Sequence, residues 1–192
     1  MPTYLPAGVR PTTRVMVFVD GENLAIRYGA MLGGAAPLPH VVYEKDVYVW
    51  SRKCNIGEKV ADVVRRFYFT SADQDDQRRQ RVFQGLKEVG IEQPRVFPCH
   101  KSKGSKQVDI SLATEMLTNA HRDNYDHVVL VAGDEDFLPV VEAVQYEGKR
   151  VTLWFVENGL SQKLQSRADY FYDLGSNVLF QKDNNALSFI DW

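Results

Sequence analysis

The sequence has few cysteines, no long hydrophobic run and almost no net charge. Its two cysteines, Cys54 and Cys99, match no CxxC spacing, which favours a reduced, cytoplasmic protein while leaving one bridge between them open. The longest apolar runs, such as 128–132 and 151–156, are far shorter than the roughly 20 residues of a membrane helix, so we expect no membrane segment. A formal charge of -2 provides no global positive field, so any bound polyanion needs local basic patches or metal ions.

The composition is that of one globular domain with an ordinary core. The chain has 192 residues, of which 44% are hydrophobic and 25% charged, and such a chain needs no disulfide or structural zinc to fold. Segment 1–13 is proline-containing and lacks an apolar centre, so we interpret it as an extended lead-in rather than a signal peptide. Segment 175–192 is too apolar for a free tail, so we expect it to pack on the domain or on a partner subunit as a homodimer contact.

Short apolar runs alternate with amphipathic segments along residues 14–174. The expected strands are 15–19, 63–69, 95–97, 127–131, 150–156 and 170–172. The expected helices are 22–28, 41–54, 75–89, 107–120, 137–147 and 161–168, with a loop at 29–39. Parallel strands need crossovers that pack back on the sheet, so this order predicts an α/β fold, a three-layer α/β/α sandwich with a mainly parallel sheet.

Carboxylates follow two of the expected strands directly. Asp20 ends the first, and Asp134 and Asp136 come just after 127–131. Ligands of parallel sheets bind beyond the carboxyl ends of the strands, so these are candidate site residues. The alternative is purely structural, with Asp20 and Asp136 as N-caps of the helices that follow.

Asp109 is a further candidate because of its place on a helix. The helical spacing puts it in the middle of a broad apolar stripe that extends to Leu117 and Ile110. A carboxylate there needs a cation, several donors or an aqueous cleft; pairing with Lys106 or first-turn helix-dipole stabilisation would also satisfy it. If Asp20, Asp109, Asp134 and Asp136 share one cleft, a hard divalent cation relieves their repulsion, and Mg²⁺ or Mn²⁺ is expected.

In combination, four segments resemble an NYN domain of the PIN-like nuclease superfamily, with closest similarity to its LabA-like branch. The segments are Val17-Phe-Val-Asp-Gly-Glu-Asn-Leu24, Lys106-Gln-Val-Asp109, Tyr125-Asp-His-Val-Val-Leu-Val-Ala-Gly-Asp-Glu-Asp-Phe137 and Gly148-Lys-Arg-Val151. The resemblance runs from about residue 14 to 174 and implies a metal-dependent ribonuclease with a PIN-like fold. It implies that Asp20, Asp109, Asp134 and Asp136 are the acidic active-site positions and that Asn23 is their polar partner. Glu135 stands where members often carry Ser, and Glu115 where they often carry Asp.

RNA is the expected partner, and metal-assisted phosphodiester hydrolysis the expected reaction. Lys101, Lys103 and Lys106 lie in a Ser/Gly loop leading to Asp109 and are candidate phosphate contacts. An Arg cluster at 78, 79 and 81 is a second basic patch, more typical of a solvated helix face. Tyr28, Tyr43 and Trp50 are candidates for base stacking, although core packing is their commoner role.

Two other functions fit parts of the pattern. A haloacid-dehalogenase-like phosphatase also has a strand that ends in Asp and a later Gly-Asp block. That chemistry needs further aspartates where this chain has Glu22 and Leu138, so it fits less well. The other alternative is a non-catalytic module that binds RNA or protein through a metal bridge.

Overall fold

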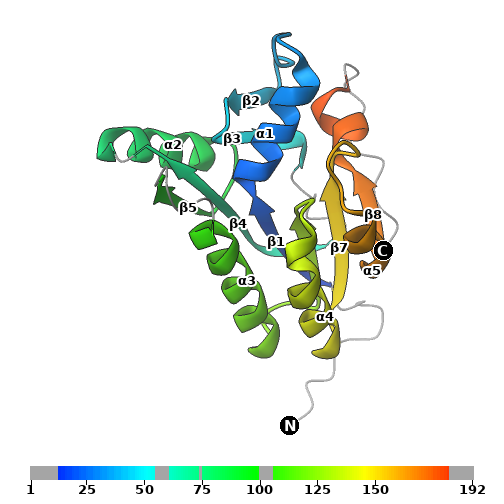
Figure 1. The fold of residues 1–192 in the computed structure, drawn as a ribbon. Coiled ribbons are helices and arrows are strands. Elements are labelled where there is room, and N and C mark those ends of the chain that lie inside the picture. The colour runs from blue at the N-terminus through cyan, green and yellow to red at the C-terminus, as the bar shows by residue number, and fades with distance from the viewer. Residues whose placement is uncertain (1–12, 55–60, 74, 100–105, 182–192) are drawn as a thin grey trace, which may run out of the picture.

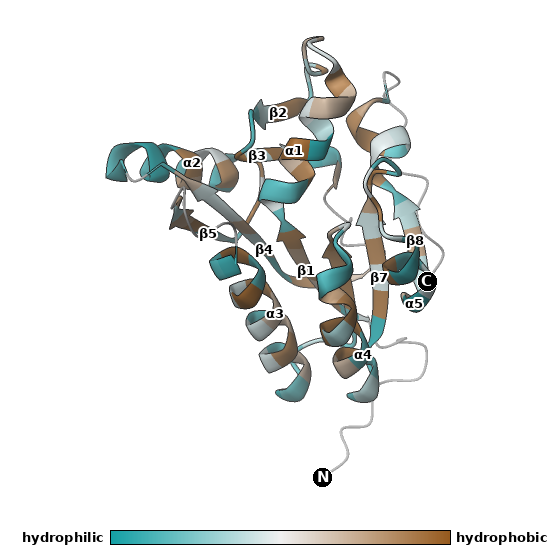
Figure 2. Cartoon of the chain, viewed as in Figure 1, coloured by the Kyte–Doolittle hydropathy of each residue, from teal (hydrophilic) through white to brown (hydrophobic). Residues whose placement is uncertain are grey.

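The computed structural model describes residues 13–54, 61–73, 75–99 and 106–181, whose centre is a six-stranded parallel sheet (Figure 1). The strand order is β5-β4-β1-β6-β7-β8. The strands are β1 (Arg14–Asp20), β4 (Asp62–Ala72), β5 (Gln93–Pro98), β6 (His127–Val131), β7 (Arg150–Phe155) and β8 (Tyr170–Asp173). Figure 2 shows the central strands as nearly continuous hydrophobic runs, as expected for strands covered on both faces.

Helices cover both faces of the sheet. The helices on one face are α1 (Gly21–Leu32) and α2 (Asp76–Glu88), and those on the other are α3 (Lys106–His121), α4 (Leu138–Tyr146) and α5 (Gln162–Arg167). Alternate residues of β1 divide between the two cores, with Val17 packing on the α1 side and Phe18 on the α3 side. This arrangement confirms the predicted three-layer α/β/α sandwich.

The order of the strands reverses between β1 and β6. From β1 the sheet continues through β4 and β5 to one side, and through β6, β7 and β8 to the other. Val19 of β1 is paired with Val131 of β6, so the carboxyl ends of the two strands lie together. This is the topological switch point, where open parallel sheets bind their ligands.

The helix predicted at 41–54 is wrong, because the segment forms a hairpin. Its strands β2 (Val41–Glu44) and β3 (Tyr48–Ser51) pair antiparallel beside α1, and a short 3₁₀ turn (Arg52–Cys54) follows. Most of the strand residues are β-branched or aromatic, which suits strands, and Asp46 turns the chain with a φ of 58°. The buried Tyr68 hydroxyl on β4 donates to the Val49 carbonyl and accepts from the Val49 amide, 3.0 Å each, which fixes β3 on the sheet.

The remaining segments differ little from expectation. Helix α1 runs into the predicted loop at 29–39 and ends at Gly33, which has a left-handed φ of 56°. After β8, a short π-helix (Gly175–Leu179) buries Val178 and Leu179 in the α1-side core. Segments 1–12 and 182–192, which carry most of the predicted lead-in and tail, lie outside the described residues.

The fold also shows where the two cysteines lie and how apolar its helices are. Cys54 is buried, Cys99 is exposed, and both are free thiols. In the part of the chain that the structure describes, no helix combines the length and apolar character needed to cross a membrane.

Candidate functional site

Asp20 is a buried carboxylate at the junction of β1 and α1. Its side chain is only 3% exposed and accepts a hydrogen bond from the Asn23 backbone amide at 3.3 Å, so it caps the N-terminus of α1 as the structural alternative predicted. Burial raises the pKa of Asp20 to about 7, and the nearby charges of Asp109, Glu22 and Asp134 add to the increase, although the Asn23 amide opposes it. The cap alone therefore does not satisfy this carboxylate.

Glu22 is a further carboxylate of the site and was not among the predicted site residues. It lies in the first turn of α1 and accepts a hydrogen bond from the Ser71 hydroxyl of β4 at 2.8 Å. Its charge raises the pKa of both Asp20 and Asp109. The position two residues after a strand-ending Asp was a usable signal, because the first turn of a helix after a strand points into the same edge of the sheet.

Asp134 and Asp136 follow β6 and are both exposed. The Asp134 carboxylate accepts from the Asp136 amide at 3.1 Å and caps a 3₁₀ turn (Glu135–Phe137) that leads into α4. The cap of this segment is thus Asp134, whereas Asp136 was the expected one. Between them, Glu135 points to α5 instead, where it lies 3.6 Å from Lys163 and accepts from Ser161 at 3.4 Å.

Asp109 reaches the same region from the first turn of α3. The buried stripe of α3 is narrower than predicted, because Ile110 is 65% and Leu117 37% exposed. Asp109 is therefore half-buried at the edge of the stripe rather than in its middle. Burial raises its pKa to about 6, and the charges of Asp134, Glu22 and Asp136 contribute. Among the described residues, the charges that shift its pKa belong to carboxylates, which disfavours pairing with Lys106.

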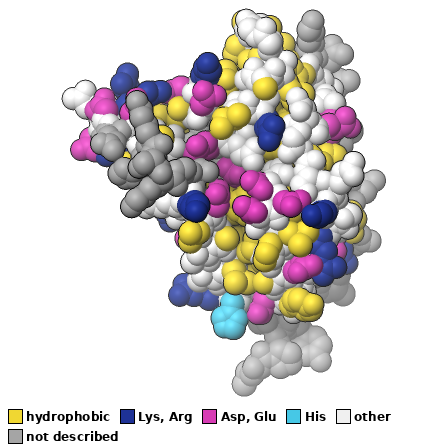
Figure 3. All heavy atoms as spheres, viewed as in Figure 1, with side chains coloured by type: hydrophobic (Ala, Val, Ile, Leu, Met, Phe, Trp, Pro, Cys, Tyr) yellow, Lys and Arg dark blue, Asp and Glu magenta, His cyan; other side chains and the backbone are white. Residues whose placement is uncertain are grey.

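Three separate segments of the chain, at 20–22, 109 and 134–136, hence place carboxylates within electrostatic reach of one another at the switch point. Figure 3 shows Asp and Glu side chains gathered in the middle of this face, near where α1, α3 and α4 meet in Figure 1. Among the described residues, no three His, Cys, Asp or Glu side chains are arranged to hold a metal ion as they stand. The oxygen donors fit a Mg²⁺-like ion, since such ions bind through one or two carboxylates and keep several waters.

Two glycines bring backbone close to neighbouring side chains at this site. A Cβ at Gly21 would lie 1.9 Å from the Tyr68 ring, and one at Gly133 would lie 2.2 Å from the Phe155 ring. Gly21 directly follows Asp20, and Gly133 directly precedes Asp134. They let the chain turn from strand to helix without pushing Asp20 and Asp134 outward.

The expected basic contacts are only partly described. Lys106 is exposed at the start of α3, one turn before Asp109, whereas Lys101 and Lys103 lie outside the described residues. Arg78 is paired with Glu44 at 2.9 Å and with Asp73, and Arg79 is paired with Asp76. The first two members of the Arg cluster are therefore largely neutralised by carboxylates.

Of the other expected site residues that the structure describes, only Asn23 lies next to a carboxylate of the acidic cluster. Asn23 is half-buried in the first turn of α1, beside Asp20. Glu115 lies further along α3, where the Asn119 amide donates to its carboxylate at 3.4 Å, and it does not contribute to the raised pKa values of Asp20 or Asp109. Tyr28 and Trp50 are fully buried and belong to the core, as their commoner role predicted.

Comparisons with known proteins agree with this architecture. The chain is similar to the uncharacterized protein MJ0482 of Methanocaldococcus jannaschii, with 34% identity over 80 residues, which are 42% of this chain and 32% of that protein. It therefore spans about a third of that relative's length. The crystal structure of VPA0982, a protein of unknown function from Vibrio parahaemolyticus, has a similar fold. That match has a TM-score of 0.58 and 23% identity, and it covers 83% of this chain and 91% of that one.

A family model identifies the family of this chain, which the names of these two relatives do not give. The model of the NYN domain matches residues 14–176, which include all three segments that carry the acidic cluster. NYN domains have a PIN-like fold and are generally predicted to be nucleases. The chain therefore belongs to the NYN domain family.

Proposed function

We propose that this protein is a divalent-metal-dependent ribonuclease that hydrolyses phosphodiester bonds at the acidic cluster. The observation that carries the proposal is the buried carboxylate of Asp20, whose pKa is raised to about 7 at the topological switch point by burial and by the neighbouring Asp109, Glu22 and Asp134. Such a group is costly to ionise unless a cation joins it. Perturbed carboxylates that converge at a ligand-binding edge are typical of catalytic centres.

The proposed roles follow from where each side chain lies. Asp20 and Asp134, from adjacent strands, would hold Mg²⁺ or Mn²⁺, and Asp109 and Asp136 would bind it directly or through water. The bound ion would supply an activated water and neutralise charge on the phosphate. Asn23 would orient a water or a phosphate oxygen by hydrogen bonding.

The proposal that the substrate is RNA is supported by local positive charge near the acidic cluster. Lys106 is exposed one turn before Asp109, which suits a contact to a phosphate of the RNA backbone, and Lys101 and Lys103 precede it in sequence. Such contacts do not depend on base sequence, which is compatible with a chain of formal charge -2 that binds RNA only locally.

Several broader assignments accompany this proposal. We propose membership of the LabA-like branch, a catalytic domain over 14–174 and a tail, 175–192, that packs on the domain or on a partner subunit of a homodimer. The two free cysteines support a reducing, cytoplasmic location. A phosphatase that attacks through Asp20 is less compatible, because a side chain 3% exposed is a poor nucleophile for a bulky phosphate ester.

A nuclease panel tests this function. The full chain is incubated with end-labelled single-stranded RNA and DNA in Mg²⁺, in Mn²⁺ and in chelator. We expect cleavage of RNA with either metal and none in chelator, because a bound metal ion would activate the attacking water. RNA binding without cleavage under every metal condition would contradict the enzyme and favour a non-catalytic module.

A further inference from the structure

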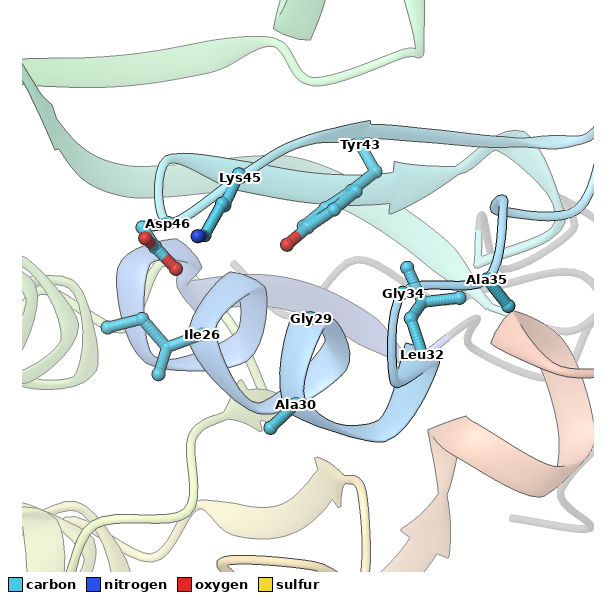
Figure 4. A pocket seen from close by; sticks show the side chains of 9 residues that line it. All are labelled: Ile26, Gly29, Ala30, Leu32, Gly34, Ala35, Tyr43, Lys45 and Asp46. Atoms are coloured by element: carbon cyan, nitrogen blue, oxygen red, sulfur yellow. The ribbon is translucent and has the colours of Figure 1, made fainter.

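A pocket lies between α1 and the β2–β3 hairpin. It has a volume of about 420 Å³, within the range of roughly 300–1,000 Å³ that small-molecule sites occupy. Figure 4 shows helix α1 along one side and Tyr43, Lys45 and Asp46 of the hairpin along the other. Its remaining lining residues are Ile26, Gly29, Ala30, Leu32, Gly34 and Ala35.

The lining combines an apolar wall, one aromatic ring and a few polar groups. Tyr43 is half-buried and meets the Tyr28 ring edge-on at 5.1 Å, so packing holds its ring in place. A Cβ at Gly29 would lie 2.2 Å from the Tyr43 hydroxyl, so the absence of a side chain there lets the hydroxyl reach α1. Lys45 and Asp46 are exposed and stand at one end of the pocket (Figure 4). An apolar pocket with an aromatic ring and hydrogen-bonding groups suits an unstacked nucleobase.

The pocket is connected to the acidic cluster through two elements. Ile26, at its near end, follows Asp20 by six positions along α1, which is about 9 Å of helical rise. On the hairpin side, Arg78 joins Glu44, the residue before Lys45, to Asp73, which follows the end of β4. That strand also carries Ser71, the hydrogen-bond donor to Glu22. Ile26 of the pocket and Asp20 of the cluster thus lie along one helix, and Arg78 ties the hairpin to the end of β4.

We propose that this pocket holds one nucleobase of a single-stranded RNA, next to the nucleotides whose phosphates lie at the acidic cluster. The inference rests on the proposed ribonuclease function and adds a base-binding site to it. The Tyr43 ring and Ile26 provide the apolar surface, and Lys45 lies where it can contact the phosphate of the same nucleotide. Other aromatic candidates, Tyr28 and Trp50, are fully buried and out of reach of a base.

Binding is measured with a chain that does not cut, so that affinity is separated from cleavage. In an Asp134→Asn background, fluorescence anisotropy gives the Kd of a short single-stranded RNA and of a series in which one nucleotide at a time is abasic. We expect one abasic position to weaken binding about tenfold, because stacking of one base on an aromatic ring contributes on this scale. In a Tyr43→Leu variant the same series is expected to be flat.

The controls separate the ring from the fold. Tyr43→Phe keeps the ring and is expected to retain the abasic profile, and so is Val42→Ala, which alters the exposed neighbour on the opposite side of β2. A flat abasic series in the unmodified pocket, or a position-specific loss that survives Tyr43→Leu, overturns the base-binding site even if the parent chain cuts RNA. Position-specific loss abolished by Tyr43→Leu supports it even if the parent chain cuts nothing, in which case only the ribonuclease proposal fails.

Discussion

Asp134→Asn is expected to reduce Mn²⁺-stimulated RNA cleavage by 100-fold or more while the chain stays folded. The asparagine can still accept the hydrogen bond from the Asp136 amide that caps the turn before α4, so the local backbone keeps its support. The asparagine lacks the negative charge with which Asp134 would attract a bound cation. Metal-ion stabilisation of a phosphoryl transition state is worth several kcal/mol, and each 1.36 kcal/mol is tenfold in rate.

Glu135→Gln is the matched control for this change. It also removes one exposed carboxylate from the same turn, but that carboxylate points to Ser161 and Lys163 of the α5 region. We expect its cleavage rate to stay within about twofold of the parent chain. Equal losses in the two variants would mean that net charge of the turn, rather than the acidic cluster, governs the activity.

Asp20→Asn is expected to stabilise the metal-free chain at pH 8 by about 2–4 kcal/mol. The native pKa of about 7 lies above the ordinary value of 3.8, which corresponds to a penalty of about 4 kcal/mol for folding with an ionised Asp20. The amide of asparagine carries no charge and can accept the same hydrogen bond from Asn23. A gain of this size raises Tm by roughly 5–15 °C in a chain of this length.

The pH dependence of this gain has a definite sign. Between about pH 4 and pH 7 the native chain binds more protons at Asp20 than the unfolded chain does, so its stability falls as pH rises through that window. Asparagine does not titrate, so the advantage of Asp20→Asn grows from pH 4 to pH 7 and then levels off. Thermal unfolding in chelator at a series of pH values measures it, and a variant less stable than the parent at pH 8 contradicts the burial of a repelled charge.

The sequence was sufficient to predict the layers of the fold but not the hairpin. Strands such as β1 and β6 are buried on both faces and therefore appear as continuous apolar runs. The hairpin was not predicted because its second strand is buried at every position, from Tyr48 to Ser51. Its apolar residues therefore show no two-residue alternation. Tertiary contacts hold it as a strand, since the Tyr68 hydroxyl of β4 hydrogen-bonds to the backbone of Val49, and the Thr70 hydroxyl donates to the carbonyl of Val47 in the turn just before the strand.

The candidate site was predictable in position and less so in detail. Carboxylates after adjacent strands pointed to one edge of the sheet, and Asp20, Asp109, Asp134 and Asp136 do interact there. Glu22 was missed although its position two residues after Asp20 was a usable signal; its hydrogen bond with the Ser71 hydroxyl, from a strand far away in sequence, is visible only in the structure. The exposure of Ile110, which makes Asp109 an edge residue of its helix, depends on how α3 sits on the sheet, and helical spacing alone does not give that rotation.

The most direct measurement of the central claim is the thermal shift on adding Mn²⁺ at pH 8 to the parent chain, Asp20→Asn and Asp134→Asn. A ligand at 100 times its Kd stabilises the state that binds it by about 2.7 kcal/mol, which is roughly 5–10 °C here. If the carboxylates share a divalent ion, the parent Tm rises by this amount while both variants stay close to their metal-free values. An unchanged parent Tm, or the same increase in all three chains, would contradict a metal centre at the switch point.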